Sequence, residues 1–164
     1  MRREEREAAY VEFVAARQSH LRRIAHGVCR DASRAEDVLQ DALVKLYVAW
    51  PRVRLENAEA YTRRIIVRAN LDQVRRPFRS REVSGLDGHD RGEESEASYE
   101  DRSVLHDALR DLPEMQRKVV VLRHWVGLSV RETAQDLGIS EGTVKSYCSR
   151  GLEKLQAALE TSRS

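Results

Sequence analysis

The stretch SVRETAQDLGISEGTVKSYCSR, residues 129–150, has the spacing of a helix-turn-helix and decides the fold of the C-terminal part of the chain. Ala134 is small where two helices would cross, Gly138 suits a left-handed turn, and Val144 fills the space between the helices. The second helix then presents a polar side of the kind that enters the major groove of DNA. An ordinary tight helical hairpin is the alternative for this pattern taken alone.

The rest of the chain also has helical periodicity, and no segment alternates long enough to indicate a strand. The clearest apolar stripe lies in residues 35–50 and ends at Pro51. It consists of Ala35, Val38, Leu39, Ala42, Leu43, Leu46, Tyr47 and Trp50. The capping patterns at Ser33 and at Ser129, together with Ser140, predict where three helices begin. Further helices are predicted over 4–30, with a break near 18–20, and over 57–76, 103–111 and 113–126. The fold class is therefore all-α.

Charge is distributed in two opposite blocks although the net charge is only +2. Residues 61–81 contain seven arginines and one acid, whereas residues 82–101 contain eight acids and one base. Little apolar content and several serines and glycines predict an acidic, flexible linker over residues 79–102. The linker would join two small helical domains, residues 1–78 and residues 103–164, the second with the helix-turn-helix.

The basic block falls on the helix predicted over 57–76. Arg64, Arg68 and Arg75 share one face of that helix, opposite the apolar side chains that would enter a core. Arginine makes forked contacts to phosphate, so this face favours phosphate binding over a plainly solvated surface.

Enzyme chemistry has no recognisable constellation in the sequence. There is no glycine-rich phosphate loop, nucleophile elbow or metal-spaced cluster, so we expect no catalysis, metal or cofactor. A small hydrolase using His20, His26 or His106 as a base is a remote alternative. His26 and Cys29 are more consistent with packing than with half a metal site. The charged N-terminus and the absence of a long apolar run predict a reduced, cytoplasmic protein without membrane contact.

Three segments together resemble the extracytoplasmic-function sigma factors of bacterial RNA polymerase. LRDLPEMQRKVVVLRHWVGLSVRETAQDLGISEGTVKSYCSRGLEKLQ, residues 109–156, resembles their region four. AEDVLQDALVKLYVAW, residues 35–50, resembles the core of region two, and NAEAYTRRIIVRANLDQVRR, residues 57–76, resembles the helix that follows it. The two region-two segments and the region-four segment occur in the same order as in the family, so the resemblance is far more specific than a helix-turn-helix alone.

The resemblance implies a non-enzymatic subunit that binds core RNA polymerase, directs it to promoter DNA and assists promoter melting. The polar side of the striped helix would dock on the polymerase through Asp37, Gln40, Asp41 and Lys45. The loop from Pro51 to Glu56 would capture a flipped base of the −10 element. The other −10 contacts would come from Asn57, Arg63, Arg64, Arg68 and Arg75.

The −35 element would be read by the second helix of the helix-turn-helix. The matching positions are Lys145, Ser146, Ser149 and Arg150, while Arg131 and Thr143 would hold phosphates. Relatives of this kind are often held inactive by an anti-sigma factor, which adds a third candidate partner. The alternative function is a dimeric helix-turn-helix regulator that binds DNA without core polymerase.

Overall fold

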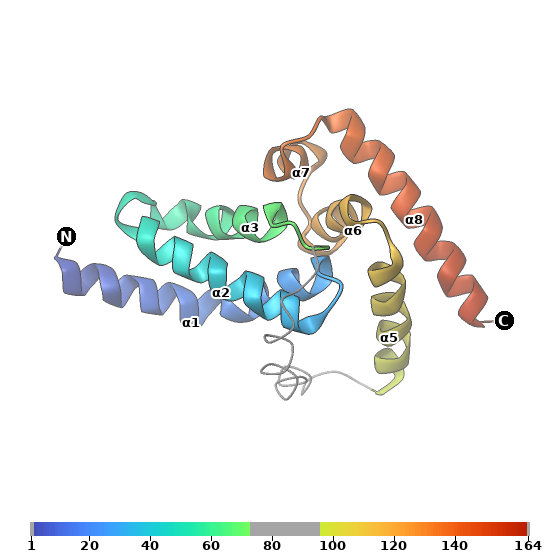
Figure 1. Cartoon of the computed structure of the whole chain (residues 1–164), viewed down its shortest axis with the longest axis horizontal. Coiled ribbons are helices and arrows are strands. Elements are labelled where there is room, and N and C mark those ends of the chain that lie inside the picture. Colours follow the sequence, from blue (N-terminus) through green and yellow to red (C-terminus); the bar gives the residue numbers. More distant parts are fainter. Residues whose placement is uncertain (1, 73–95, 164) are drawn as a thin grey trace.

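A computed structural model describes residues 2–72 and 96–163 of the chain, with side chains described outside 96–102. Every regular element in these two ranges is helical, which confirms the predicted all-α fold (Figure 1). The helices are α1 (Arg3–Val28), α2 (Ala32–Ala49), α3 (Ala58–Arg68), α5 (Glu96–Asp111), α6 (Glu114–Val120), α7 (Val130–Leu137) and α8 (Glu141–Arg163). Shorter turns are the 3-10 helices η1 (Trp50–Arg52) and η2 (Leu55–Asn57) and the π-helical turn η3 (Val121–Val126). Residues 2–72 are called the first half below, and residues 96–163 the second half.

Helices α1 and α2 pack against each other in the first half. The stripe on α2 is buried from Ala35 to Leu46, as its spacing of three and four predicts, although Tyr47 remains exposed. The helix begins earlier than expected because Asp31, and not Ser33, accepts a hydrogen bond from the Arg34 amide at 2.7 Å. The break predicted near residues 18–20 of α1 is wrong, since α1 runs without interruption. The polar side chains in that stretch lie on partly or fully exposed positions, where a helix tolerates them.

The connection between α2 and α3 is more regular than predicted. The segment expected to be a loop, Pro51 to Glu56, is largely wound into η1 and η2. Asn57 precedes α3, but its side chain makes no capping hydrogen bond. Trp50 closes the core here, in a cluster with Phe13, Leu46 and Ala58.

Helix α3 ends at Arg68, so the helix predicted through Arg76 is wrong from Ala69 to Asp72. The backbone turns extended at Ala69, where ψ is 145°. Side chains from other helices donate hydrogen bonds to the carbonyl oxygens that the helix leaves unpaired. Lys118 donates to the Ala69 oxygen at 3.2 Å, and Arg34 donates to the oxygen of the next residue at 2.9 Å.

The second half wraps α8 against α5, α6 and α7. Helix α5 begins at Glu96, seven residues before the predicted start at Ser103, so the end of the predicted linker is helical. The remainder of that linker, residues 79–95, lies outside the described residues. Gly127 stops η3 with a left-handed φ of 87°, which a glycine adopts without strain.

The two halves pack against each other along the C-terminal part of α1 and along α3 (Figure 1). One buried cluster includes Leu21 and Ile24 of α1 together with Val121, Leu122 and Leu128 of the second half. Periodicity in the sequence predicts a core for each half but does not predict that the two are joined.

Candidate nucleic-acid interface

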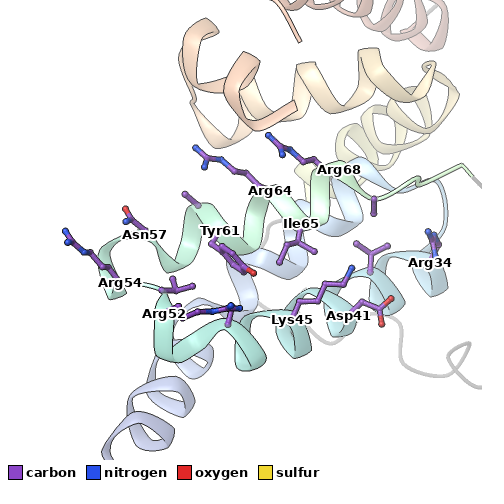
Figure 2. A pocket seen from close by; sticks show the side chains of 15 residues that line it. Arg34, Asp41, Lys45, Arg52, Arg54, Asn57, Tyr61, Arg64, Ile65 and Arg68 are labelled. Atoms are coloured by element: carbon purple, nitrogen blue, oxygen red, sulfur yellow. The ribbon is translucent and has the colours of Figure 1, made fainter. Parts of the chain in front are cut away.

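A groove of about 1010 Å³ lies between α2 and α3 and is closed at one end by η1 and η2 (Figure 2). Its lining includes six basic side chains and a single acid, Asp41. The basic residues are Arg34, Lys45, Arg52, Arg54, Arg64 and Arg68. Arg52 and Arg54 come from the turns at the closed end, while Lys45 extends from α2 toward α3 (Figure 2). This charge pattern attracts a polyanion, and phosphate groups are the ligands that arginine forks fit best.

The groove also presents groups that suit a base. Tyr61 and Ile65 point from α3 toward α2, and Asn57 stands at the same end as Arg54 (Figure 2). Trp50 is buried in the core and packs edge-on against Tyr10, with ring centroids 5.5 Å apart. Tyr61 is therefore the aromatic side chain that lines the groove, although its place in the helical pattern indicates only a core position.

The expected −10 arginines are divided between the groove and the second half. Arg64 and Arg68 line the groove edge and point toward α7 (Figure 2). Arg63 is only 8% exposed, and it bonds to the Asp136 carboxylate of α7 at 2.5 Å. Arg64 reaches the same carboxylate at 3.0 Å. Arg75 lies outside the described residues.

The expected polymerase contacts follow one outward side of α2. Gln40, Asp41 and Lys45 are exposed and Asp37 is half-buried. Asp41 and Lys45 also line the groove, so the structure brings them together with the expected DNA contacts. Two valines that the sequence analysis missed, Val44 and Val48, lie on the same helix with 60% and 68% of their surface exposed. Their signal in the sequence is two apolar residues four apart that do not fit the buried stripe.

The helix-turn-helix forms as its spacing predicts. Gly138 has a φ of 67°, and Val144 is fully buried between the helices in one cluster with Ala134. Ser140 begins α8 by accepting a hydrogen bond from the Thr143 amide at 3.1 Å.

The first helix of the motif, α7, has its capping box in place. The Ser129 hydroxyl accepts from the Glu132 amide at 3.0 Å, and the Glu132 carboxylate accepts from the Ser129 amide at 2.9 Å. These hydrogen bonds favour the ionised carboxylate and lower the pKa of Glu132.

The expected −35 contacts gather on the outer side of the motif. Arg131, Lys145, Ser149 and Arg150 are exposed, and Ser146 is half-buried. The hydroxyl of half-buried Thr143 lies 2.8 Å from that of Ser140. In Figure 1, α8 lies on the side of the second half that faces away from α1 and α2. The reading side is thus open in the same arrangement that engages the arginines of α3.

Within residues 2–72 and 96–163, no group of three or more histidine, cysteine or acidic side chains could hold a metal ion. No helix in the same ranges is long and apolar enough to cross a membrane. His26 pairs with Glu36 at 2.8 Å, and Cys29 packs in the core.

Comparisons with known proteins cover both halves. Residues 13–81 match the family profile described as Sigma-70 region 2, and residues 102–155 match the profile described as Sigma-70, region 4. The RNA polymerase sigma-E factor of Streptomyces antibioticus is 38% identical over 157 residues, which cover 93% of this chain and 85% of that protein. The ECF RNA polymerase sigma factor SigM of Mycobacterium tuberculosis is 32% identical over 152 residues, or 92% and 77% of the two chains.

Two solved structures have a similar fold. The sigma factor RpoE in complex with the anti-sigma factor NepR, from Bartonella quintana, superposes with a TM-score of 0.71 at 25% identity. The superposition covers 93% of this chain and 97% of that one. CnrH, solved with the cytosolic domain of CnrY, shares the fold with a TM-score of 0.62 at 23% identity.

Proposed function

Because this chain belongs to the extracytoplasmic-function family of RNA polymerase sigma factors, it directs RNA polymerase to promoters, and we propose how its surfaces divide that work. Residues 1–78 form the unit for core polymerase and the −10 element. Residues 79–102 connect this unit to residues 103–164, which form the unit for the −35 element. The dimeric regulator considered as an alternative is not favoured, since it leaves the region 2 similarity unexplained.

The −10 element is assigned to the groove between α2 and α3, and the basic lining of that groove is the observation that carries the assignment. Arg52 and Arg54 contact phosphates at the closed end, and Lys45 contacts them from α2. Tyr61 and Asn57 face an unstacked base, because an aromatic ring stacks on any base and an amide can hydrogen-bond its edge. Stacking of this kind contributes about 1–3 kcal/mol per base, enough to offset much of the cost of unstacking.

The −35 element is assigned to α8. Lys145, Ser149 and Arg150 lie on its exposed side within the first three turns, the part of a recognition helix that reaches base edges. Ser146 belongs to the same reading set. Arg131, on α7, contacts phosphate and sets the register of the helix in the groove.

Core polymerase is assigned to the outward side of α2. Exposed Val44 and Val48 provide apolar contact area, and Asp37, Gln40 and Asp41 surround them with polar groups. Asp41→Lys is expected to weaken binding to core polymerase and to strengthen binding to DNA, because it replaces the one acid of a basic groove. Weakening of both would contradict the assignment.

An anti-sigma factor is proposed as a third partner. The support is the RpoE complex with NepR, whose sigma chain aligns with nearly the whole of this one. The protein itself is proposed to be non-enzymatic and cytoplasmic, and catalysis belongs to the polymerase it binds.

The experiment that tests the proposal is reconstitution with core RNA polymerase on genomic DNA, followed by sequencing of transcript 5′ ends. Starts that share two upstream elements are expected only when the sigma factor is present. The double variant Arg52→Ala/Arg54→Ala should reduce such transcription by at least about tenfold, because each lost phosphate contact weakens DNA binding. Arg3→Ala removes an exposed arginine that does not line the groove and serves as the control for loss of a surface cation. Promoter-specific transcription by the double variant at the wild-type level would refute the groove assignment.

A further inference from the structure

A thiol and an imidazole face each other between α8 and η3. The His124 Nε2 atom lies 3.3 Å from the Cys148 sulfur, in a hydrogen-bonding contact. Cys148 is half-buried and His124 is exposed, so a small molecule can reach the pair from solvent. Neither side chain lines the groove, and neither belongs to the residues proposed to read the −35 element.

The backbone that carries His124 is held by contacts within the second half. Gly127 ends η3 in the left-handed region, and the Leu128 amide donates to the Leu122 carbonyl at 2.9 Å. The Arg123 guanidinium donates to the Leu128 carbonyl at 2.5 Å. The imidazole is therefore presented to α8 by an anchored turn.

This arrangement pairs a nucleophile with a base. In the tautomer that leaves Nε2 without a proton, the Cys148 thiol donates to the ring, and the ring can accept the thiol proton as the sulfur attacks. Burial raises the pKa of the Cys148 thiol, although the Arg123 guanidinium opposes the shift. Because the free thiolate is then scarce near neutral pH, the neighbouring proton acceptor determines how readily the sulfur reacts.

The other cysteine of the chain provides an internal comparison. Cys29 is 2% exposed and packs in the core that both halves share. A reagent in solvent cannot reach its sulfur while the protein stays folded. The folded chain therefore offers one accessible thiol, and that thiol has the imidazole beside it.

An adduct on Cys148 would disturb the recognition helix at the point where it is seated. The Cys148 side chain packs against the buried cluster that contains Ala134 of α7 and Val144 of α8. On the surface of α8, Lys145 and Ser149 are its neighbours, three positions before it and one after it. A bulky group on the sulfur must displace α8 from the cluster or extend beside these reading side chains, and both outcomes misplace contacts to base edges.

We propose that Cys148 is a site of reversible thiolation, that His124 is its base, and that the adduct switches off reading of the −35 element. The substrate is a low-molecular-weight disulfide. The Cys148 sulfur attacks one sulfur of this disulfide, and the old S–S bond breaks as the new one forms. The departing thiolate takes the proton that His124 accepted. The Cys148 sulfur is thereby oxidised to a mixed disulfide, and one equivalent of thiol is released as the reduced product.

The inference rests on the proposed −35 role of α8 and adds a chemical signal that controls it. The proposed polymerase contacts lie on α2, in the other half of the chain. The thiolated protein should therefore still bind core polymerase while it no longer reads the −35 element.

The first test treats the free chain with glutathione disulfide and follows the products by mass spectrometry. One glutathionyl group is expected at Cys148 and none at Cys29 of the folded protein. His124→Gln keeps a polar side chain without the base and should slow thiolation at least about tenfold. His106→Gln changes an exposed histidine of α5 and is the control, expected to react within about twofold of the wild type. Circular dichroism verifies that the variants fold, and an unmodified Cys148 or equal rates for the two variants overturns the proposal.

The second test measures what the adduct does to the holoenzyme. Thiolated wild-type protein is freed of excess disulfide before core polymerase is added, so that thiols of the polymerase are not modified. Its affinity for core polymerase should stay within about twofold of the unmodified chain, because the two sites are distant. Promoter-specific transcription should fall at least about tenfold, because base contacts of α8 are lost, and dithiothreitol should restore it. Cys148→Ala should transcribe equally with and without the disulfide treatment.

Transcription by the thiolated chain at the unmodified level overturns the switch. Loss of core binding on thiolation also overturns it, as does an equal loss of transcription by treated Cys148→Ala. Failure of the proposed function would look different. Unmodified wild-type holoenzyme would then start no promoter-specific transcripts, while the thiolation rates of the free chain would be unaffected.

Discussion

Arg117 is the most completely buried charged side chain in the described part of the protein, and its replacement should reveal how strongly the two halves are coupled. It is 0% exposed and donates three hydrogen bonds. One goes to the Val28 carbonyl at the end of α1, one to the Leu112 carbonyl of its own half, and one to the Asp72 carboxylate, at 2.8, 2.8 and 2.7 Å. Arg117→Met keeps an unbranched apolar stem but removes all three donors.

The expected loss of stability follows from the groups left behind. The two carbonyl oxygens lose buried partners, and an unsatisfied buried acceptor costs about 1–3 kcal/mol. Asp72 is partly exposed and regains water. Removal of the guanidinium also relieves the cost of burying its charge, which offsets part of the loss. The net decrease in the free energy of unfolding should be about 2–4 kcal/mol, or roughly 5–15 °C in Tm for a chain of this size.

Urea and thermal unfolding of the free protein, followed by circular dichroism, measure this loss. Arg110→Met is the matched control, because the Arg110 side chain is half-exposed and its contact to the Asp107 carboxylate is long, at 3.9 Å. An exposed pair of that kind contributes less than about 1 kcal/mol. If Arg117→Met unfolds within about 0.5 kcal/mol of the wild type, the buried network across the halves is not present in solution and the argument from it fails.

Three further predictions concern packing, reactivity and readout. Gly151→Ala should lower Tm, because the new methyl would lie 2.7 Å from a Val120 methyl. Overpacking of this kind costs about 1–3 kcal/mol, which exceeds the gain of about 1 kcal/mol in helix propensity. An unchanged or higher Tm would contradict the close crossing of α6 and α8. Burial raises the pKa of the Cys29 thiol to about 12, so a fluorescent iodoacetamide near about pH 8 should label native protein at half-buried Cys148 and should reach Cys29 only after unfolding. Rapid native labelling of Cys29 would show that the core opens. Arg150→Ala should cost about 1–3 kcal/mol at one base position when holoenzyme selects −35 sequences, and selection at wild-type stringency would argue against base contact.

Local patterns in the sequence predicted the parts of the fold that local forces determine. The stripe on α2, the left-handed Gly138 and the capping box of Ser129 depend on residues within a few turns of one another, so their spacing is sufficient. Errors occurred where a distant group decided the local structure. The end of α3 at Arg68 is an example, because Lys118 takes the carbonyl of the residue that follows.

The candidate site, too, could be predicted only where neighbouring residues in the sequence determine it. The arginine face of α3 could be read from periodicity, but its partner could not, since Asp136 lies more than 70 positions away along the chain. Guanidinium groups bind carboxylates, helix C-termini and phosphates alike, so a basic face in a sequence does not reveal which of them it meets. Tyr61 was predicted to flank the loop and to lie on the apolar side of its helix. Its place in the groove could not be predicted, because a half-buried groove position and a core position have the same helical spacing.

Apolar contacts between the halves determine what opening requires. Val121 packs on Gly27 of α1, where an added methyl would lie 3.4 Å from it, and the Trp125 ring stacks on His20 with centroids 5.7 Å apart. Separation exposes such side chains to water, at about 1.5–3 kcal/mol for each large one that becomes fully exposed. Phosphate contacts can replace the hydrogen bonds that Arg63 and its neighbours lose, but they cannot cover an apolar surface. Opening therefore needs a partner that covers these surfaces or holds the halves apart, and DNA alone does not meet that requirement.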